Sequence, residues 1–172
     1  MRSLIAFIGL LALSGPAAHA EQILPGLWEI SSSGMQIDGQ PLPAMQEMLD
    51  QLGRLPAEQR QMMEEMLAQQ GVALGDQGVR VCLNEEQVKA RRLPIEQEVG
   101  CTQEITESTD AYWKFRYQCP TSKGEGVARF ISDREFTTEV KSAIQSEQGV
   151  QNAEVRTHAR WVAADCAGLS TR

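Results

Sequence analysis

Polar and apolar residues alternate along most of the chain after residue 25, and the apolar positions are rich in β-branched and aromatic types. A period of two with this composition predicts half-buried β-strands. The connections between these segments are too short for parallel crossovers, so we expect one antiparallel sheet, strongly curved or forming an incomplete barrel. About seven strands are predicted: 26–37, 78–83, two within 101–119, 126–132, 135–144 and 154–163.

The segment 101–119 predicts a specific hairpin with its turn near Thr109-Asp110. Placing Cys101 opposite Cys119 matches apolar with apolar residues on one face and opposite charges on the other, all in one register. The expected pairs are Cys101/Cys119, Gln103/Tyr117 and Ile105/Phe115 on one face, with Trp113 at the turn end, and Glu104/Arg116 and Thr106/Lys114 on the other. Short loops at 132–134 and at Gln148-Gly149 mark two further turns.

Residues 41–75 interrupt the strand pattern with a stretch rich in Met, Gln, Glu, Leu and Ala. It predicts two helices, Pro43–Leu52 and Pro56–Gln70, divided at Gly53, and we expect this hairpin to cap the sheet. A third, short helix at 85–92 is indicated by the capping box of Asn84 and Gln87, and Pro94 ends it.

The N-terminus reads as a cleavable signal peptide at residues 1–20. Arg2 precedes an apolar run from Leu4 to Leu13, and Ala18-His19-Ala20 gives the small-x-small pattern before the cleavage point. The run is too short for a membrane span, and no other stretch is long and apolar enough to span. We therefore expect an exported protein that acts outside the cytoplasm, with residues 21–172 forming one domain.

Charge argues against two classes of partner. The chain carries a net charge of −7, which becomes −8 when Arg2 leaves with the signal peptide, and no Lys/Arg cluster is present. Such an acidic domain is a poor partner for nucleic acid or for anionic lipid.

All four cysteines lie after the predicted cleavage point, and an even count in an oxidising compartment predicts two disulfides. The hairpin register favours Cys101–Cys119, which leaves Cys82–Cys166. The alternative pairs neighbours, Cys82–Cys101 with Cys119–Cys166. No Cys-x-x-Cys pair is present, so zinc is not expected.

Several short segments together resemble the bacterial exported "domain of unknown function 3617" family. They are Pro25-Gly26-Leu27-Trp28-Glu29-Ile30, the Met-rich helical stretch, Val81-Cys82-Leu83 leading into Glu85-Glu86-Gln87, and Arg160-Trp161-Val162-Ala163-Ala164-Asp165-Cys166. Here the Met-rich insert is shorter than in many members. The resemblance implies a periplasmic location and a shared fold, and it implies no activity or cofactor.

Catalytic groups are few. His158 is the one histidine after residue 20, and strand alternation places it on a polar face with Arg156 and Arg160, which indicates a solvated surface position. The carboxylate pairs Glu64-Glu65 and Glu85-Glu86, like Glu47, Asp50 and Glu58, read as solvated helix faces. We therefore expect a protein that is not an enzyme; a small enzyme of unknown reaction is the rival class.

Methionine and tryptophan offer the remaining candidate sites. Met45 and Met48, like Met63 and Met66, are spaced to share a helix face, which favours packing on the sheet but also suits Cu(I) or a partner surface. The tryptophans Trp28, Trp113 and Trp161 fall on predicted strands, where they fill a core or line a cavity for an apolar ligand. We expect a binding protein that engages an apolar ligand or a protein partner through the concave face of the sheet or the Met-rich hairpin.

Overall fold

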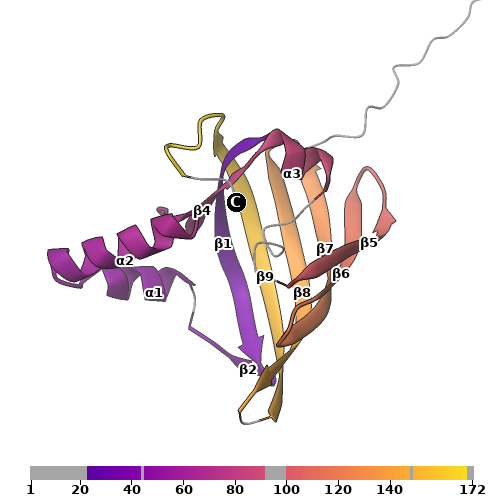
Figure 1. The fold of residues 1–172 in the computed structure, drawn as a ribbon, viewed down its shortest axis with the longest axis horizontal. Helices are drawn as coiled ribbons and strands as arrows, with labels where there is room; N and C mark the ends of the chain where they lie inside the picture. The colour runs from indigo at the N-terminus through magenta and orange to yellow at the C-terminus, as the bar shows by residue number, and fades with distance from the viewer. Residues whose placement is uncertain (1–22, 44, 92–99, 148, 170–172) are drawn as a thin grey trace, which may run out of the picture.

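The computed structural model describes residues 23–43, 45–91, 100–147 and 149–169 (Figure 1). The predicted signal peptide at residues 1–20 lies outside these ranges. Pro94, the predicted end of the third helix, and Gln148, part of a predicted turn, also lie outside them.

The described residues form one antiparallel nine-stranded sheet that stays open, with β3 and β5 at its two ends, so it is not closed into a barrel. The order is β3-β4-β1-β9-β8-β7-β6-β5, and β2 pairs with β1 off this path. The strands are β1 Gly26–Ile37, β2 Gln40–Pro41, β3 Val72–Leu74, β4 Val79–Leu83, β5 Thr102–Ser108, β6 Tyr112–Gln118, β7 Ser122–Ser132, β8 Glu135–Ser146 and β9 Gly149–Ala163. The expected curved, mainly β fold is therefore confirmed.

Two strands were missing from the prediction, β2 and β3, which have two and three residues. Segments this short carry no usable alternation, so the sequence gives no signal for them. They flank the helical insert and pair with β1 and β4. The insert thus begins and ends at paired strands.

The helices are α1 Met45–Gly53, α2 Ala57–Gln69 and α3 Glu85–Lys89. α3 has the predicted capping box: the Asn84 Oδ1 accepts from the Gln87 N–H at 2.8 Å, and the Gln87 Oε1 accepts from the Asn84 N–H at 2.9 Å. Its Val88 is buried in the core. α3, rather than the insert, therefore covers the sheet.

The expectation that the helical hairpin caps the sheet is wrong. α1 and α2 project away from the sheet beyond the side where β3 and β4 lie (Figure 1), and α2 has no buried residue. The reason is topological, because the insert leaves β1 after β2 and returns into the end strand β3. Its helices therefore extend beyond the sheet instead of crossing a face.

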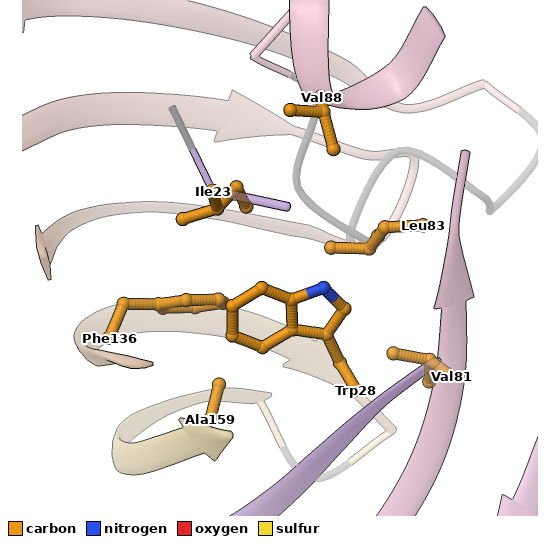
Figure 2. Close-up of a cluster of buried hydrophobic side chains, with 7 residues drawn as sticks. All are labelled: Ile23, Trp28, Val81, Leu83, Val88, Phe136 and Ala159. Atoms are coloured by element: carbon orange, nitrogen blue, oxygen red, sulfur yellow. The ribbon is translucent and has the colours of Figure 1, made fainter. Parts of the chain in front are cut away.

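The core lies between β1, β4, β8, β9 and α3 (Figure 2). Trp28 is fully buried at its centre, with its ring centroid 5.0 Å from that of Phe136, and its indole N–H donates to the Leu24 carbonyl at 2.9 Å. Burying so large a side chain with its polar atom satisfied contributes several kcal/mol, about 3 or more. The buried members are Ile23, Trp28, Val81, Leu83, Val88, Phe136 and Ala159.

The β5–β6 hairpin has the expected register from the cysteine end, with Gln103 opposite Tyr117 and Ile105 opposite Phe115. The predicted pair of Thr106 with Lys114 is wrong. A bulge after Ile105 shifts the register, so Lys114 lies opposite Glu107 and its ammonium contacts that carboxylate at 2.6 Å. The extra residue of a bulge cannot be read from alternation alone.

The four cysteines form the pairs favoured by that register. Cys101 joins Cys119 beside the hairpin, and Cys82 on β4 joins Cys166 after β9. The Cα atoms of the two pairs are 4.1 and 5.5 Å apart, respectively. The second bridge links the segment after β9 to β4, two strands away in the sheet.

Candidate functional site

The two faces of the sheet differ in chemistry. Because successive side chains point to opposite faces, residues on the side of Trp28, Phe136 and Ala159 form the core face, while their sequence neighbours form the other. That second face is charged on every long strand: it carries Glu29, Arg80, Arg156, Arg160, Glu135, Glu139, Lys141, Glu125, Arg129, Lys114, Arg116 and Glu104. A candidate site for an apolar partner must therefore lie elsewhere.

The helical hairpin, formed by α1 and α2, carries three of the large apolar residues that are exposed in the described chain. Met62 and Met66, one turn apart on α2, are 66% and 55% exposed. Single exposed apolar residues are ordinary, whereas a contiguous exposed apolar patch is typical of an interaction surface. Among the residues that the structure describes, seven large apolar residues are exposed, and the second to fourth lie on α1 and α2: Leu42, Met48, Met62, Met66, Ile131, Val150 and Val162.

The structure divides the four methionines proposed as copper ligands. Met45 and Met63 are half-buried, whereas Met48 and Met66 are exposed. The stripes expected to pack on the sheet divide by residue type: their leucines are half-buried and their methionines are exposed. The leucines are Leu49, Leu52 and Leu67, and the methionines are Met48, Met62 and Met66. The exposed methionines of the helices are therefore Met48, Met62 and Met66. Met45 and Met63 of the predicted set are not among them, and Met62 was not predicted.

Charge on the hairpin is acidic. Between Met45 and Gln69 the chain carries five acidic and two basic residues. The acidic ones are Glu47, Asp50, Glu58, Glu64 and Glu65, all exposed as predicted. Arg60 pairs with Glu64 at 3.8 Å, and Gln61 donates to Glu65 at 3.0 Å. The exposed methionines are thus set among negative charges.

A groove of about 770 Å³ crosses β5 to β9 and reaches the turn after β1. One wall is a row of directly opposed residues whose charges alternate from strand to strand: Glu104, Arg116, Glu125, Lys141 and Glu154. Within the described residues, no ion pair within 4 Å joins neighbours of this row, although Arg156 pairs with Glu154. The lining suits a polar rather than an apolar ligand.

His158 lies on the charged face with Arg156 and Arg160, as the alternation of β9 predicts. It is not fully solvated: its ring Nε2 contacts the Glu135 Oε1 at 2.6 Å, and its side chain is about one-third exposed. Ser31 lies directly opposite on β1, but its hydroxyl donates to the His158 carbonyl at 3.3 Å. The sequence did not reveal this partner, because the β8–β9 register places Glu135 opposite Arg160 and its contact with His158 is diagonal.

Among the described residues, Glu29 is the one charged residue that is buried, with 7% of its surface exposed. The sequence pattern did not predict its burial. Its carboxylate accepts from the Arg80 Nε–H at 2.9 Å and from the main-chain N–H groups of Gln77 at 3.1 Å and Asp76 at 3.3 Å. Burial favours the neutral acid, but these bonds and the Arg80 charge outweigh it and hold the pKa of Glu29 below its ordinary value. Glu29 therefore fixes the β3–β4 turn to β1.

A small cavity of about 340 Å³ adjoins this network, and Trp161 lines it. Trp161 is half-buried, its indole N–H donates to the Pro25 carbonyl at 3.1 Å, and the Arg134 guanidinium lies 5.0 Å from its ring centroid. Trp28 and Trp113 lie in the interior, 0% and 6% exposed, so their rings offer almost no surface to a ligand. The three tryptophans do not line one cavity.

No helix within the described ranges combines the length and the apolar character needed to cross a membrane. The described residues also bring together no group of three or more His, Cys, Asp or Glu side chains able to hold a metal ion.

Comparison with known proteins gives a family and a relative. A family model described as "Protein of unknown function (DUF3617)" matches residues 23–166. The chain is 52% identical over 128 residues to the "Uncharacterized protein in lpd-3 5'region" of Pseudomonas putida, an alignment that covers 74% of this chain and 90% of that protein. No solved structure matches. The match over the whole sheet, from Ile23 to Cys166, shows that the chain belongs to the DUF3617 family.

Proposed function

We propose that this is an exported periplasmic binding protein, without enzymatic activity, that engages a protein partner through its helical hairpin. The observation that carries the proposal is the exposure of Met48, Met62 and Met66 on helices that project from the sheet. Methionine side chains are flexible and polarizable, and they are used on surfaces that adapt to a partner.

Charge defines the kind of partner. The exposed methionines lie on a segment with three more acidic than basic residues. Complementary potentials steer association and exclude wrong partners. The expected partner is therefore a protein with an apolar groove rimmed by Lys and Arg.

An apolar small molecule is the less supported ligand. One wall of the groove across β5 to β9 is a row of alternating charges, and Trp28 and Trp113 are buried in the interior. Native mass spectrometry of the protein from the periplasmic fraction tests this alternative, because a stored lipid or metal adds mass that disappears on denaturation.

The partner hypothesis is tested by capture with tagged full-length protein expressed in its own host. The variant M48Q/M62Q/M66Q removes the apolar surface while keeping good helix formers of similar length. The matched control, I131T/V150T, removes exposed apolar residues from the sheet strands β7 and β9. We expect one partner to be retained by the wild type and the control and to be lost with the hairpin variant.

The captured partner is then purified and titrated against the same three proteins. The proposal predicts at least a tenfold weaker Kd for the hairpin variant, and an affinity that falls as salt rises. Equal binding of all three proteins, or loss of binding with the sheet control alone, overturns it.

Cu(I) binding is a second candidate because Met48, Met62 and Met66 expose soft thioether ligands. Changing Met45, Met48, Met63 and Met66 to Leu is expected to abolish Cu(I) affinity with the fold intact. If affinity survives that change and also the exchange of Met62, the thioethers of the hairpin are not the ligands.

A further inference from the structure

We infer that Met62 and Met66 form a site of methionine oxidation that switches the hairpin face from apolar to polar. This inference rests on the proposed function, because the modified residues belong to the same surface. It adds a chemical class of modification, conversion to the sulfoxide by a peroxide. The evidence is a difference in exposure among neighbouring thioethers of one helix.

Access distinguishes the three methionines of α2. Met62 and Met66 are 66% and 55% exposed, whereas Met63, next to Met62 in the chain, is half-buried. Because more than half of each of these two residues is exposed, a peroxide reaches them without any unfolding. Oxidation of methionine follows exposure, so the folded helix directs the chemistry to two of its three thioethers.

The step balances with hydrogen peroxide as the oxidant. The thioether sulfur attacks one peroxide oxygen, an S–O bond forms, and the O–O bond breaks. The second oxygen leaves as water after proton transfer, so the sulfur loses two electrons and the peroxide gains them. The product is a polar, chiral side chain where an apolar one stood, which disrupts a Met-lined interface.

Position on the helix makes the two sites act together. Residues four apart lie on one helix face, so Met62 and Met66 present a single patch. Glu64 and Glu65 are already paired with Arg60 and Gln61 on the same helix. Oxidation at both sulfurs therefore removes the main apolar feature of α2 and leaves its charges in place.

The test is peptide mapping after peroxide treatment of the folded full-length protein. Trypsin releases one peptide, residues 61–80, that contains Met62, Met63 and Met66, so each serves as an internal standard for the others. We expect Met62 and Met66 to gain one oxygen about threefold or more faster than Met63. In urea, with the disulfides reduced, the three rates should become equal.

The switch itself is measured by retention of the folded protein on a phenyl matrix. Peroxide should shorten the retention of the wild type and of M48L, in which the exposed methionine of α1 is already replaced. It should leave the retention of M48L/M62L/M66L unchanged, because leucine stays apolar and has no sulfur. Equal oxidation of Met63 in the folded protein overturns the site, and unchanged wild-type retention overturns the switch. Neither measurement involves a partner, so their failure is distinguishable from failure of the binding proposal.

Discussion

Glu29 on β1 and Arg80 on β4 lie directly opposite each other, and their side chains form a hydrogen-bonded ion pair of 2.9 Å. Glu29 is buried while Arg80 is about one-third exposed, so the pair is only partly shielded from solvent. The turn that supplies the two N–H donors contains Gly75. A Cβ at this position would lie 2.5 Å from the Glu29 Oε2, so a larger residue would disturb the contact between the turn and Glu29. The glutamate of the Pro-Gly-Leu-Trp-Glu segment thus has a structural role that its sequence neighbours do not reveal.

The first prediction concerns pH. In the folded protein the pKa of Glu29 lies below its ordinary value of 4.5. The ionised Glu29 carboxylate therefore stabilises the fold fully above the unfolded-state pKa, and this stabilisation is lost as pH falls through the folded-state pKa. E29Q should lower the free energy of unfolding by about 2 kcal/mol at pH 7, and this difference should shrink in acid. Urea unfolding at a series of pH values measures it. E139Q, at an exposed carboxylate, is the control, and a constant difference from pH 7 to pH 3 would contradict the prediction.

The second prediction concerns the two disulfides. Chain-entropy estimates for loops with sequence separations of 18 and 84 residues give about 3 and about 4.5 kcal/mol. C82S/C166S should therefore destabilise the protein more than C101S/C119S in urea unfolding. Non-reducing digestion should yield two linked peptide pairs in this connectivity. A peptide that links Cys82 to Cys101 would exclude both pairs.

The third prediction concerns the close packing of β6 on β7. Phe115 is buried over Gly126, and a Cβ at Gly126 lies 2.5 Å from the Phe115 Cζ and 2.9 Å from the Glu139 carbonyl oxygen. G126A should cost about 1–3 kcal/mol through overpacking. G34A is the matched control, since nothing lies within 4 Å of its added Cβ, and it should be neutral or slightly stabilising. Thermal unfolding compares the two, and equal midpoints would contradict the packing argument.

The fourth prediction concerns export. If residues 1–20 are a signal peptide, the protein in the periplasmic fraction should begin at Glu21. N-terminal sequencing and intact mass measure this directly. Deleting residues 2–20 should leave the protein in the cytoplasm with reduced cysteines, where the second prediction implies lower stability. An uncleaved protein outside the cytoplasm would refute the cleavage assignment.

Much of the fold could be read from local patterns. The alternation around Phe115 and Tyr117, together with the two cysteines, fixed one register of the β5–β6 hairpin. The Asn84–Gln87 capping box indicated α3, because both of its hydrogen bonds are local. These predictions succeeded where the physical cause lies within a few residues of its effect.

Other features depend on distant partners and left no local signal. The burial of Glu29 follows from a turn about fifty residues away, at Asp76 and Gln77. The exposure of Met62 and Met66 follows from where the insert leaves and re-enters the sheet, whereas their spacing is equally typical of a packed helix. Periodicity shows which residues share a face, and topology decides whether that face is covered.

The position of β1 between β4 and β9 ties folding to completion of the chain. Ile30 pairs with Ala159, so the middle of the sheet needs both the first and the last long strand. The meander from β5 to β9 pairs only sequence neighbours and can form early, while the β1–β9 pairing must first overcome the loop-closure entropy of the whole intervening chain. We therefore expect a growing or C-terminally shortened chain that lacks β9 to leave the Trp28 core incomplete, because Ala159 and the strand that pairs with Trp28 are then missing.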